Sequence, residues 1–362
     1  VYNNYGEGLV SDRFSAGATL EDNVVYDNQH ANLYLNSTTD PLVRRNLVYC
    51  TDDQRFWRKG STPTYRPGPG IQIRDETFET VVPPVSSGQV IINNLVIGWS
   101  SNFGVSTQTP GGGLNNALVA NNTFANARGQ TAEAVNNIEL SSGASYAGSR
   151  FINNLILQTA PGAILRVQGS NPDFSTFTVA HNLYSVAPPA SWFAGEAGRV
   201  VGDPRLDDPA PPLPAISIVP DRDDYRLTIN SPALDAGQAL VELADDMFAQ
   251  SRAQNGPHDI GAHEFLHRGR IIVIQTTVPA GLSQQFTFNA GYVPAAFTLS
   301  DGQEHQSGVL QAGVYSVASD PVDDWTTTAS CSNGSPASAI VIGAAESVTC
   351  TFTSVRESRL IV

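Results

Sequence analysis

The residues best suited to chemistry lie in one long insertion, residues 50–70. Its aromatic rings can stack on sugars, and its cations can pair with uronate carboxylates. In a lyase, Lys59 or Arg58 would be the base that removes the proton next to the uronate, and Asp53 is the third catalytic candidate. The residues predicted to bind a glycan or a partner are Trp57, Tyr65, Arg66 and, just beyond the insertion, Arg74.

The same insertion also fits a structural interpretation. A general base needs neighbours that depress its pKa, and spacing along the chain does not show which residues converge. The insertion is then an ordered loop packed on the flank of its domain, or a contact with another subunit.

Two groups of side chains have the types found in metal sites. The first could recruit Ca²⁺ in a lyase, although such a run is typical of a solvated turn. It consists of Asp75, Glu76 and Glu79. The second has the types of a zinc site, but its spacing indicates a structural cap. It consists of His258, Asp259, His263, Glu264 and His267. We therefore predict no metal and no cofactor, with Ca²⁺ as the alternative.

Asparagines recur in a fixed setting through the first half of the chain. Each has an apolar residue three positions before it and another two positions after it, at steps of 23, 48, 28, 32 and 28 residues. They are Asn23, Asn46, Asn94, Asn122, Asn154 and Asn182. Short repeats without a helical pattern lack a core of their own, so each must bury its apolar side against its neighbours. The repeat indicates one coil of a parallel β-helix, in which stacked asparagine amides hydrogen-bond from coil to coil.

A second strand is expected after each repeat, because apolar and polar residues alternate there. These segments are 32–35, 70–73, 103–105, 137–140 and 164–167. Two strands and a turn are the minimum for a coil. The repeat asparagines are therefore interpreted as scaffold rather than as a site.

The composition bounds the class of protein. The 362 residues are 41% hydrophobic, which is enough to build real cores in two or three domains. The formal charge is 20 minus 34, or -14, and the only lysine is Lys59, so a nucleic-acid or anionic-membrane partner is not expected. No apolar run approaches the ~18 residues that span a bilayer. A P-loop and a G-x-S-x-G nucleophile motif are also absent from the sequence.

The repeats end after Tyr184, and an irregular, proline-rich segment follows over residues 188–220. Beyond it lies the string Asp259-Ile260-Gly261-Ala262-His263-Glu264-Phe265. Together with the repeats, this string resembles the closing portion of right-handed parallel β-helix repeat proteins, the pectate-lyase-like group, over residues 1–267. That group includes polysaccharide lyases and hydrolases as well as non-catalytic surface proteins, so the resemblance implies a fold and only suggests glycans.

Residues 268–362 show alternating strands and tight turns, which predict a small antiparallel β-sandwich. The chain as a whole is therefore expected to be all-β. The strands at 297–299, 313–317 and 348–352, with Trp325, are similar to prealbumin-like or Ig-like modules of bacterial surface proteins. The resemblance implies a stalk or connector. The lysine–asparagine crosslink of some relatives is impossible here, because no lysine lies beyond Lys59.

Cys331 and Cys350 lie 19 positions apart within this all-β pattern, and we predict that they form a disulfide. A stable disulfide indicates an oxidising compartment, so an extracellular or cell-surface location is expected. Cys50 is then a lone, buried thiol. Three N-x-S/T asparagines are glycosylation acceptors only in a source that uses that pathway. They are Asn36, Asn121 and Asn333.

The first functional expectation is an extracellular structural protein that assembles with copies of itself into a filament or surface layer. Residues 1–4 match residues 25–28, so an uncovered coil edge is expected at Val1 and Tyr2. The apolar C-terminal tail could add a strand to a neighbour. The tail consists of Leu360, Ile361 and Val362. The alternatives are a secreted lyase or hydrolase acting on an acidic polysaccharide, and an adhesin that binds a glycan without cleaving it.

Overall fold

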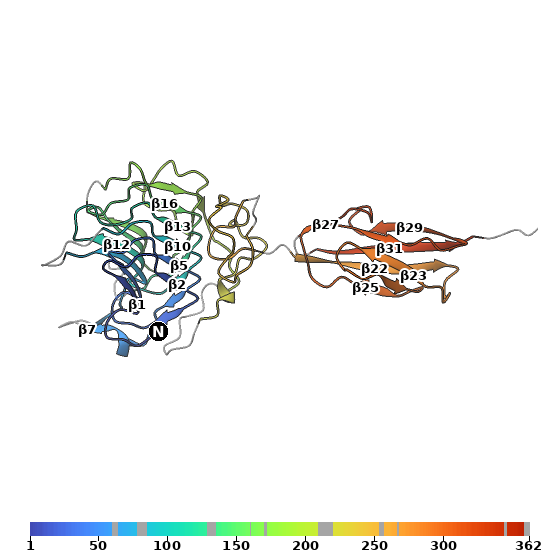
Figure 1. Ribbon diagram of the computed structural model, residues 1–362, viewed down its shortest axis with the longest axis horizontal. Coiled ribbons are helices and arrows are strands. Elements are labelled where there is room, and N and C mark those ends of the chain that lie inside the picture. The colour runs from blue at the N-terminus through green and yellow to red at the C-terminus, as the bar shows by residue number, and fades with distance from the viewer. Residues whose placement is uncertain are drawn as a thin grey trace, which may run out of the picture. The chain divides into compact units, whose positions relative to one another are not determined.

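The structure is a computed structural model of the chain. It describes residues 1–59, 64–77, 85–128, 135–159, 161–169, 172–208, 220–252, 257–265, 268–343 and 346–357. Only the backbone is described for Phe56, Arg58, Lys59, Thr64, Tyr65 and Arg268. The chain divides into two compact units, Val1–Phe265 and Leu266–Val362 (Figure 1).

The first unit is a parallel β-helix, and its main described strands form three parallel sheets. Sheet I contains β1 (Leu9–Asp12), β4 (Leu33–Asn36), β9 (Ile71–Asp75), β12 (Ser101–Thr107), β15 (Asn136–Ser141) and β18 (Ala163–Gln168). Sheet II contains β2 (Thr19–Glu21), β5 (Leu42–Arg44), β10 (Val90–Ile92), β13 (Leu118–Ala120), β16 (Arg150–Ile152) and β19 (Thr178–Ala180). Sheet III contains β3 (Val24–Tyr26), β6 (Leu47–Tyr49), β11 (Leu95–Ile97), β14 (Thr123–Ala125), β17 (Leu155–Leu157), β20 (Leu183–Tyr184) and β21 (Val200–Val201). The expected all-β class and parallel β-helix are confirmed.

Each asparagine repeat folds as two short strands, one in sheet II and one in sheet III, joined at a sharp corner. The residue before the repeat asparagine is left-handed, with φ between 51° and 58°. It is Asp22, Arg45, Asn93, Asn121, Asn153 or His181. Asn and Asp enter this region more readily than most residues, which explains the frequent Asn-Asn pair. The second strands expected from sequence belong to sheet I, so a coil has three strands and exceeds the expected minimum.

The repeat asparagines stack into the predicted ladder. The Asn94 side-chain amide donates to Oδ1 of Asn122 at 2.9 Å, and Asn122 donates to Asn154 at 3.0 Å. The same bond joins successive repeats from Asn23 to Asn182. The ladder ends where Oε1 of Glu196 accepts from the Asn182 amide at 2.8 Å. An ionised carboxylate only accepts hydrogen bonds, so Glu196 terminates the ladder.

The interior of the coils is filled by apolar rows that the parallel register aligns. One row, contributed by sheet I, is Leu33, Ile71, Phe103, Ile138 and Leu165. Each of these side chains is at most 3% exposed. Burial of such a side chain contributes about 1.5–3 kcal/mol, so stacked rows account for much of the stability of the helix.

A segment that follows the coils covers the outward face of sheet III. That face is mostly apolar: Leu47, Leu95, Leu155 and Leu183 align across it, with Thr123 between Leu95 and Leu155. They pack in one cluster with residues from the covering segment, which are Leu206, Tyr225, Leu227, Ala233, Met247, Ile260 and Ala262. The segment also contains the short helix η3 (Asp223–Tyr225). Sheet III is therefore buried on both faces.

The second unit is a β-sandwich. Its strands are β22 (Arg268–Val278), β23 (Phe286–Ala290), β24 (Phe297–Leu299), β25 (Glu304–Gln306), β26 (Leu310–Gln311), β27 (Gly313–Tyr315), β28 (Val317–Ser319), β29 (Trp325–Cys331), β30 (Ile340–Ile342) and β31 (Ser347–Arg356). One sheet has the order β25-β22-β31-β29, and the others are β24-β23-β28 and β27-β30. Because β22 and β31 run parallel, the sandwich is mixed rather than purely antiparallel.

The predicted disulfide between Cys331 and Cys350 is present and joins β29 to β31. Cys50 is a free, buried thiol whose pKa is raised to about 12 by burial. None of the helices in the described part of the chain has the length and apolar character needed to cross a lipid bilayer.

Candidate functional site

The insertion with the predicted binding residues is fastened to the β-helix by Arg66. Its Nη1 donates to the carbonyl oxygens of Cys50, Thr51 and Gly98, each at 3.0 Å. Its guanidinium also lies 4.6 Å from the centre of the Trp57 ring. Arg66 is 3% exposed and Trp57 is 7% exposed. Both side chains therefore act in holding the insertion against the coil.

The catalytic candidates lie around three small elements of the insertion. These are the helix η1 (Gln54–Phe56) and the paired strands β7 (Arg58–Lys59) and β8 (Thr64–Tyr65). Asp53 caps η1, and its carboxylate pairs with the Arg55 guanidinium at 2.6 Å. The hydrogen bond from Arg55 lowers the pKa of Asp53, which keeps this carboxylate ionised. The side chains of Arg58, Lys59 and Tyr65 lie outside the described residues.

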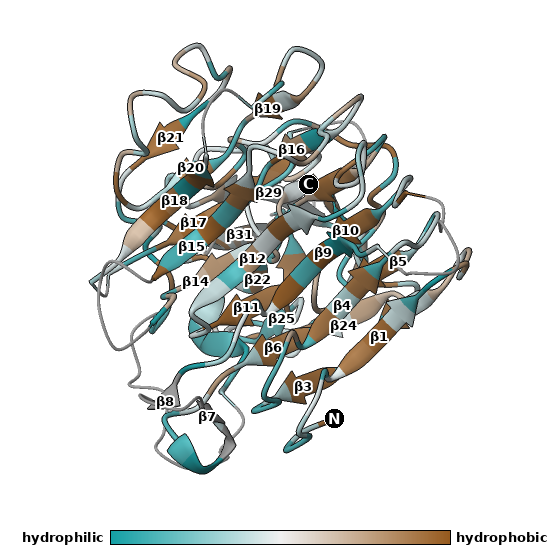
Figure 2. Ribbon diagram, turned by 90° about the vertical axis from the view of Figure 1, so that its left-hand side faces the viewer, coloured by the Kyte–Doolittle hydropathy of each residue, from teal (hydrophilic) through white to brown (hydrophobic). Residues whose placement is uncertain are grey.

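Arg74, the fourth predicted binding residue, lies on the outward face of sheet I, which Figure 2 shows towards the viewer. Successive side chains of a strand alternate between its faces, so every apolar row inside the helix has an outward row beside it. One outward row is Tyr34, Gln72, Gly104, Glu139 and Arg166. The other is Asp12, Asn36, Arg74 and Ser106. This surface, the outward face of sheet I, carries phenol, amide, carboxyl and guanidinium groups at the strand spacing of about 4.8 Å.

Hydrogen bonds organise one end of this face. Arg74 pairs with Glu76 at 3.2 Å, and both side chains are about one-third exposed, at 35% and 33%. The Asn36 amide donates to Asp12 at 2.8 Å, and its oxygen accepts from the Glu76 backbone N–H at 3.0 Å. Burial raises the pKa of the Tyr34 hydroxyl, and the charge of Glu76 adds to the effect. Arg74 and Glu76 are held in place and remain partly exposed, whereas Asn36 is buried beneath them.

The other end of the face centres on Glu139. Burial raises the pKa of its carboxyl, and the positive charge of Arg166 opposes that shift. Gln168 donates a hydrogen bond to the same carboxyl. The carboxyl of Glu139 therefore lies between an amide donor and a guanidinium group on the same face.

The insertion borders this face at Gly104. A Cβ built there would lie only 2.6 Å from Cγ of Pro69 and would force the backbone or the proline to move. Glycine therefore lets Pro69 approach the middle of the outward row. The insertion therefore contributes to the shape of this face beside Gly104.

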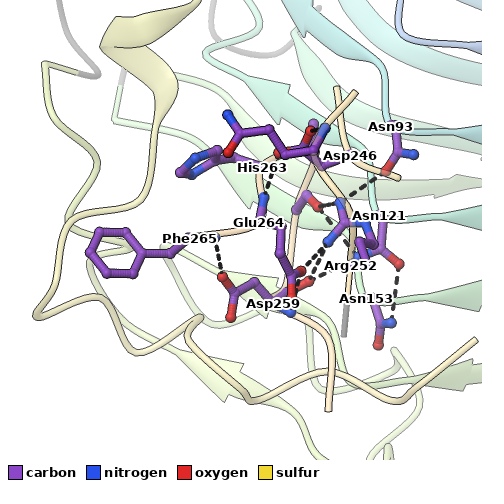
Figure 3. Close-up of polar contacts among 12 residues, drawn as sticks. Asn93, Asn121, Asn153, Asp246, Arg252, Asp259, His263, Glu264 and Phe265 are labelled. Carbon is purple, nitrogen blue, oxygen red and sulfur yellow. Dashed lines mark hydrogen bonds and ion pairs between the residues drawn. The ribbon is translucent and has the colours of Figure 1, made fainter. Parts of the chain in front are cut away.

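The string rich in His, Asp and Glu packs on the corners between sheets II and III. Arg252 lies at its centre, where Nη1 pairs with Glu264 at 2.6 Å and Nη2 donates to Asn93 at 2.9 Å (Figure 3). The corner residues also hold the backbone of the covering segment, because Asn121 donates to the Asp259 carbonyl and Asn153 to the Gln238 carbonyl, both at 2.8 Å. Within the described ranges, no group of three or more His, Cys, Asp or Glu side chains is placed to hold a metal ion. His267 lies outside those ranges.

Burial perturbs two titratable groups of this network. It raises the pKa of Asp259 to about 7, with a further contribution from the charge of Glu264. It lowers the pKa of His263 to about 3, and the positive charge of Arg226 acts in the same direction. Nδ1 of His263 accepts from the Leu227 backbone N–H at 2.9 Å. The fold therefore requires a neutral imidazole at this position.

The carboxylate considered for Ca²⁺ in β9 is occupied by protein donors. One oxygen of Asp75 accepts from the N–H and hydroxyl of Ser86, and the other accepts from the N–H of Gly113, all at 2.7 Å. Asp75 is fully buried. Glu79, its proposed companion, lies outside the described residues.

The residues expected to mediate assembly lie at the two ends of the chain. The Val1 ammonium donates to the Val24 carbonyl at 2.8 Å, and the Tyr2 ring stacks on Tyr26 with centres 4.7 Å apart. Leu360, Ile361 and Val362 lie outside the described residues.

The glycosylation sequences differ in accessibility. Asn36 and Asn121 are buried, whereas Asn333 is exposed. Only Asn333 therefore offers its side chain to a modifying enzyme in the folded protein.

Arg74 is predicted from sequence as a binding residue, whereas Tyr34, Glu139 and Arg166, on the same face, are not singled out there. Their signal was present, because each occupies an outward position in a segment of alternating residues. Comparison of the chain with protein-family models and with curated proteins gives no match, so its function must be inferred from geometry and chemistry.

Proposed function

We propose that this is an extracellular glycan-binding protein whose binding surface is the outward face of sheet I. The observation that carries the proposal is the pair of outward rows, in which polar side chains of different types lie in register on neighbouring coils. An extended polymer lying along the helix axis would meet polar groups of several types on successive coils, with an interruption at Gly104. Sugar hydroxyls both donate and accept hydrogen bonds, and this face offers both kinds of partner.

The charges on the face favour a neutral glycan over the acidic one considered from sequence. Asp12, Glu76 and Glu139 supply carboxyl groups, and Arg74 and Arg166 supply guanidinium groups. The pairing of Arg74 with Glu76 leaves that guanidinium less available to a uronate. A polyuronate would also bring its own carboxylates towards those of the protein, which disfavours binding.

The proposed location outside the cell is supported by the disulfide between Cys331 and Cys350, because such bonds persist mainly in oxidising compartments. The resemblance of the repeats to the pectate-lyase-like group is compatible with contact to polysaccharides. Cleavage is not part of the proposal.

The test is binding of the full chain to a panel of neutral and acidic polysaccharides, measured by calorimetry. Arg74→Ala and Glu139→Gln are each expected to weaken binding about tenfold, the equivalent of about 1.4 kcal/mol. Arg150→Ala is the matched control. Arg150 begins β16 of sheet II, away from the proposed binding face, and forms an exposed ion pair with Glu242. Failure to bind any glycan, or equal losses in the control, would contradict the proposal. New reducing or unsaturated ends would instead show an enzyme.

We also propose that copies of the chain assemble with one another, the role first expected from its sequence. The observation that favours this second function is an exposed, uncharged strand edge in the C-terminal unit, that of β29. Sedimentation velocity of the full chain over a range of concentrations tests it, and a species that stays monomeric throughout would contradict it.

A further inference from the structure

We propose that two copies of this chain pair through β29, antiparallel, with Thr328 facing Thr328 of the second copy. The inference rests on the proposed assembly and identifies its contact. The pairing would join two sheets of the β25-β22-β31-β29 type into one continuous sheet across a two-fold axis.

Among the described strands, β29 forms an open edge of its sheet. It is the terminal strand of its sheet, at the margin of the C-terminal unit in Figure 1, and it pairs with β31 along its whole length. Thr326, Thr328, Ala329 and Ser330 are exposed. The backbone groups on its free side are therefore open to another strand.

The backbone groups of β29 point alternately towards β31 and towards the free edge. The Ser332 N–H donates to the Thr349 carbonyl at 2.8 Å, and the Glu357 N–H donates to the Asp324 carbonyl at 2.8 Å. Hydrogen-bonded pairs alternate along an antiparallel ladder, so the even-numbered residues of β29 bond to β31. Its odd-numbered residues, Thr327 and Ala329 among them, then direct their N–H and C=O groups towards the free edge.

A symmetric pair satisfies this alternation. An antiparallel register centred on Thr328 places Thr327 opposite Ala329 of the second copy, so outward-directed groups meet outward-directed groups. The same register places Thr326 opposite Ser330 and Thr328 opposite itself. Cross-strand Thr–Thr and Thr–Ser pairs hydrogen-bond and stabilise sheets, so β29 is complementary to itself.

The sequence of β29 lacks the residues that usually block pairing at a sheet edge. Natural edges are blocked by charged residues, proline, bulges or short length, but Trp325–Cys331 spans seven residues without a charge or a proline. In the described part of this unit, the other edge strands are shorter: β24, β25, β27, β28 and β30 each span three residues, and β26 spans two. An uncharged edge also lets two acidic chains approach without repulsion at the contact.

Contacts at both ends hold β29 in place. The disulfide of Cys331 fixes one end to β31, and the ring of Trp325 packs edge-on against Phe286 with centres 5.3 Å apart at the other. A strand that is already ordered loses little conformational entropy when it pairs. The edge of β29 is thus already ordered for pairing with a strand of a second copy.

The test compares the full chain with two single variants by sedimentation velocity. Thr328→Lys and Thr328→Glu each place like charges opposite one another across the two-fold axis, so each is expected to weaken dimerisation about tenfold or more. An equimolar mixture of the two variants is expected to restore the dimer, because Lys then faces Glu. Thr298→Lys, at an exposed threonine of β24, is the matched control and is expected to dimerise like the unmodified chain.

A second variant tests the backbone rather than the side chain. Ala329→Pro removes one outward N–H and leaves the hydrogen bonds to β31 in place, so it is expected to weaken the dimer with unchanged thermal unfolding. A dimer that persists in Thr328→Lys, or a mixture that fails to recover, would overturn this contact while leaving assembly through another surface. An unmodified chain that stays monomeric would overturn the proposed assembly itself.

Discussion

The outward faces of sheets I and III differ although the two sheets share the same coils. Outside sheet III, Leu95 and Leu155 are buried beneath the covering segment. Outside sheet I, Arg74 and Glu139 lie on a surface that is partly open to solvent. The interior rows are equally apolar in both sheets, so the difference arises from the outward positions alone.

This difference separates the stability of the molecule from its proposed function. The covered face adds a second apolar layer and a buried polar network centred on Arg252. The open face buries few of its side chains, and its hydrogen-bond donors and acceptors lie in register on neighbouring strands. Substitutions on the covered side should therefore act on folding, and those on the open side should act on binding.

The largest expected effect follows from Arg252→Ala, on the covered side. Arg252 is 1% exposed, and its removal leaves the Glu264 carboxylate buried without its ionic partner. Breaking a buried ion pair in this way typically costs about 3–5 kcal/mol. Urea unfolding monitored by circular dichroism measures the loss.

Arg150→Ala removes an exposed ion pair for comparison, with side chains 37% and 41% exposed. Its cost is expected to be about 0–1 kcal/mol. Equal losses in the two variants would show that the covering network contributes no more than a surface contact.

The inner architecture of both sheets could be predicted from sequence, because the repeat places Asn94, Asn122 and Asn154 at equivalent positions and stacking follows. The disulfide was predictable for a similar local reason, since its cysteines lie on neighbouring strands. The third strand of each coil was less evident, because it depends on a left-handed corner residue such as Asn93.

The outward faces were harder to predict, because their partners are distant in sequence. Arg252 reaches Asn93 across 159 positions, and no local pattern announces that contact. One signal did exist: strands such as Leu95–Ile97 and Leu155–Leu157 are entirely apolar rather than alternating, which is typical of strands buried on both faces. The outward residues of sheet I carry no compact motif, whereas the insertion concentrates aromatic and basic residues in one short segment.

A smaller loss of stability is expected when the pH is lowered, because His263 lies on the covered side. His263 has its pKa lowered from 6.5 to about 3, so the unfolded chain binds a proton below about pH 6.5 that the folded chain does not. Its contribution to stability is complete above pH 6.5 and falls as the pH decreases towards 3. The loss at pH 5 is expected to be about 2 kcal/mol relative to pH 8.

His263→Asn is the matched variant, since Asn can still accept from the Leu227 N–H but does not titrate. Asp259, whose raised pKa makes the folded state less stable as the pH rises from about 4 to 7, contributes equally to both proteins and cancels in the comparison. Parallel stability curves for the two proteins between pH 8 and 5 would contradict this role of His263.

The smallest effect on folding is expected from Arg166→Ala, on the open face. Arg166 is exposed in β18 and lies beside Glu139 across the sheet, so its removal should change the free energy of unfolding by no more than about 0.5 kcal/mol. Leu155→Ala, at a fully buried outward position of sheet III, should cost about 2–5 kcal/mol. For both variants, urea unfolding measures the change in stability, and calorimetry measures the change in affinity for a glycan. The two changes show whether each face contributes to folding or to binding. A large loss of stability in Arg166→Ala would show that the open face is structural too, and the division between a folding face and a binding face would fail.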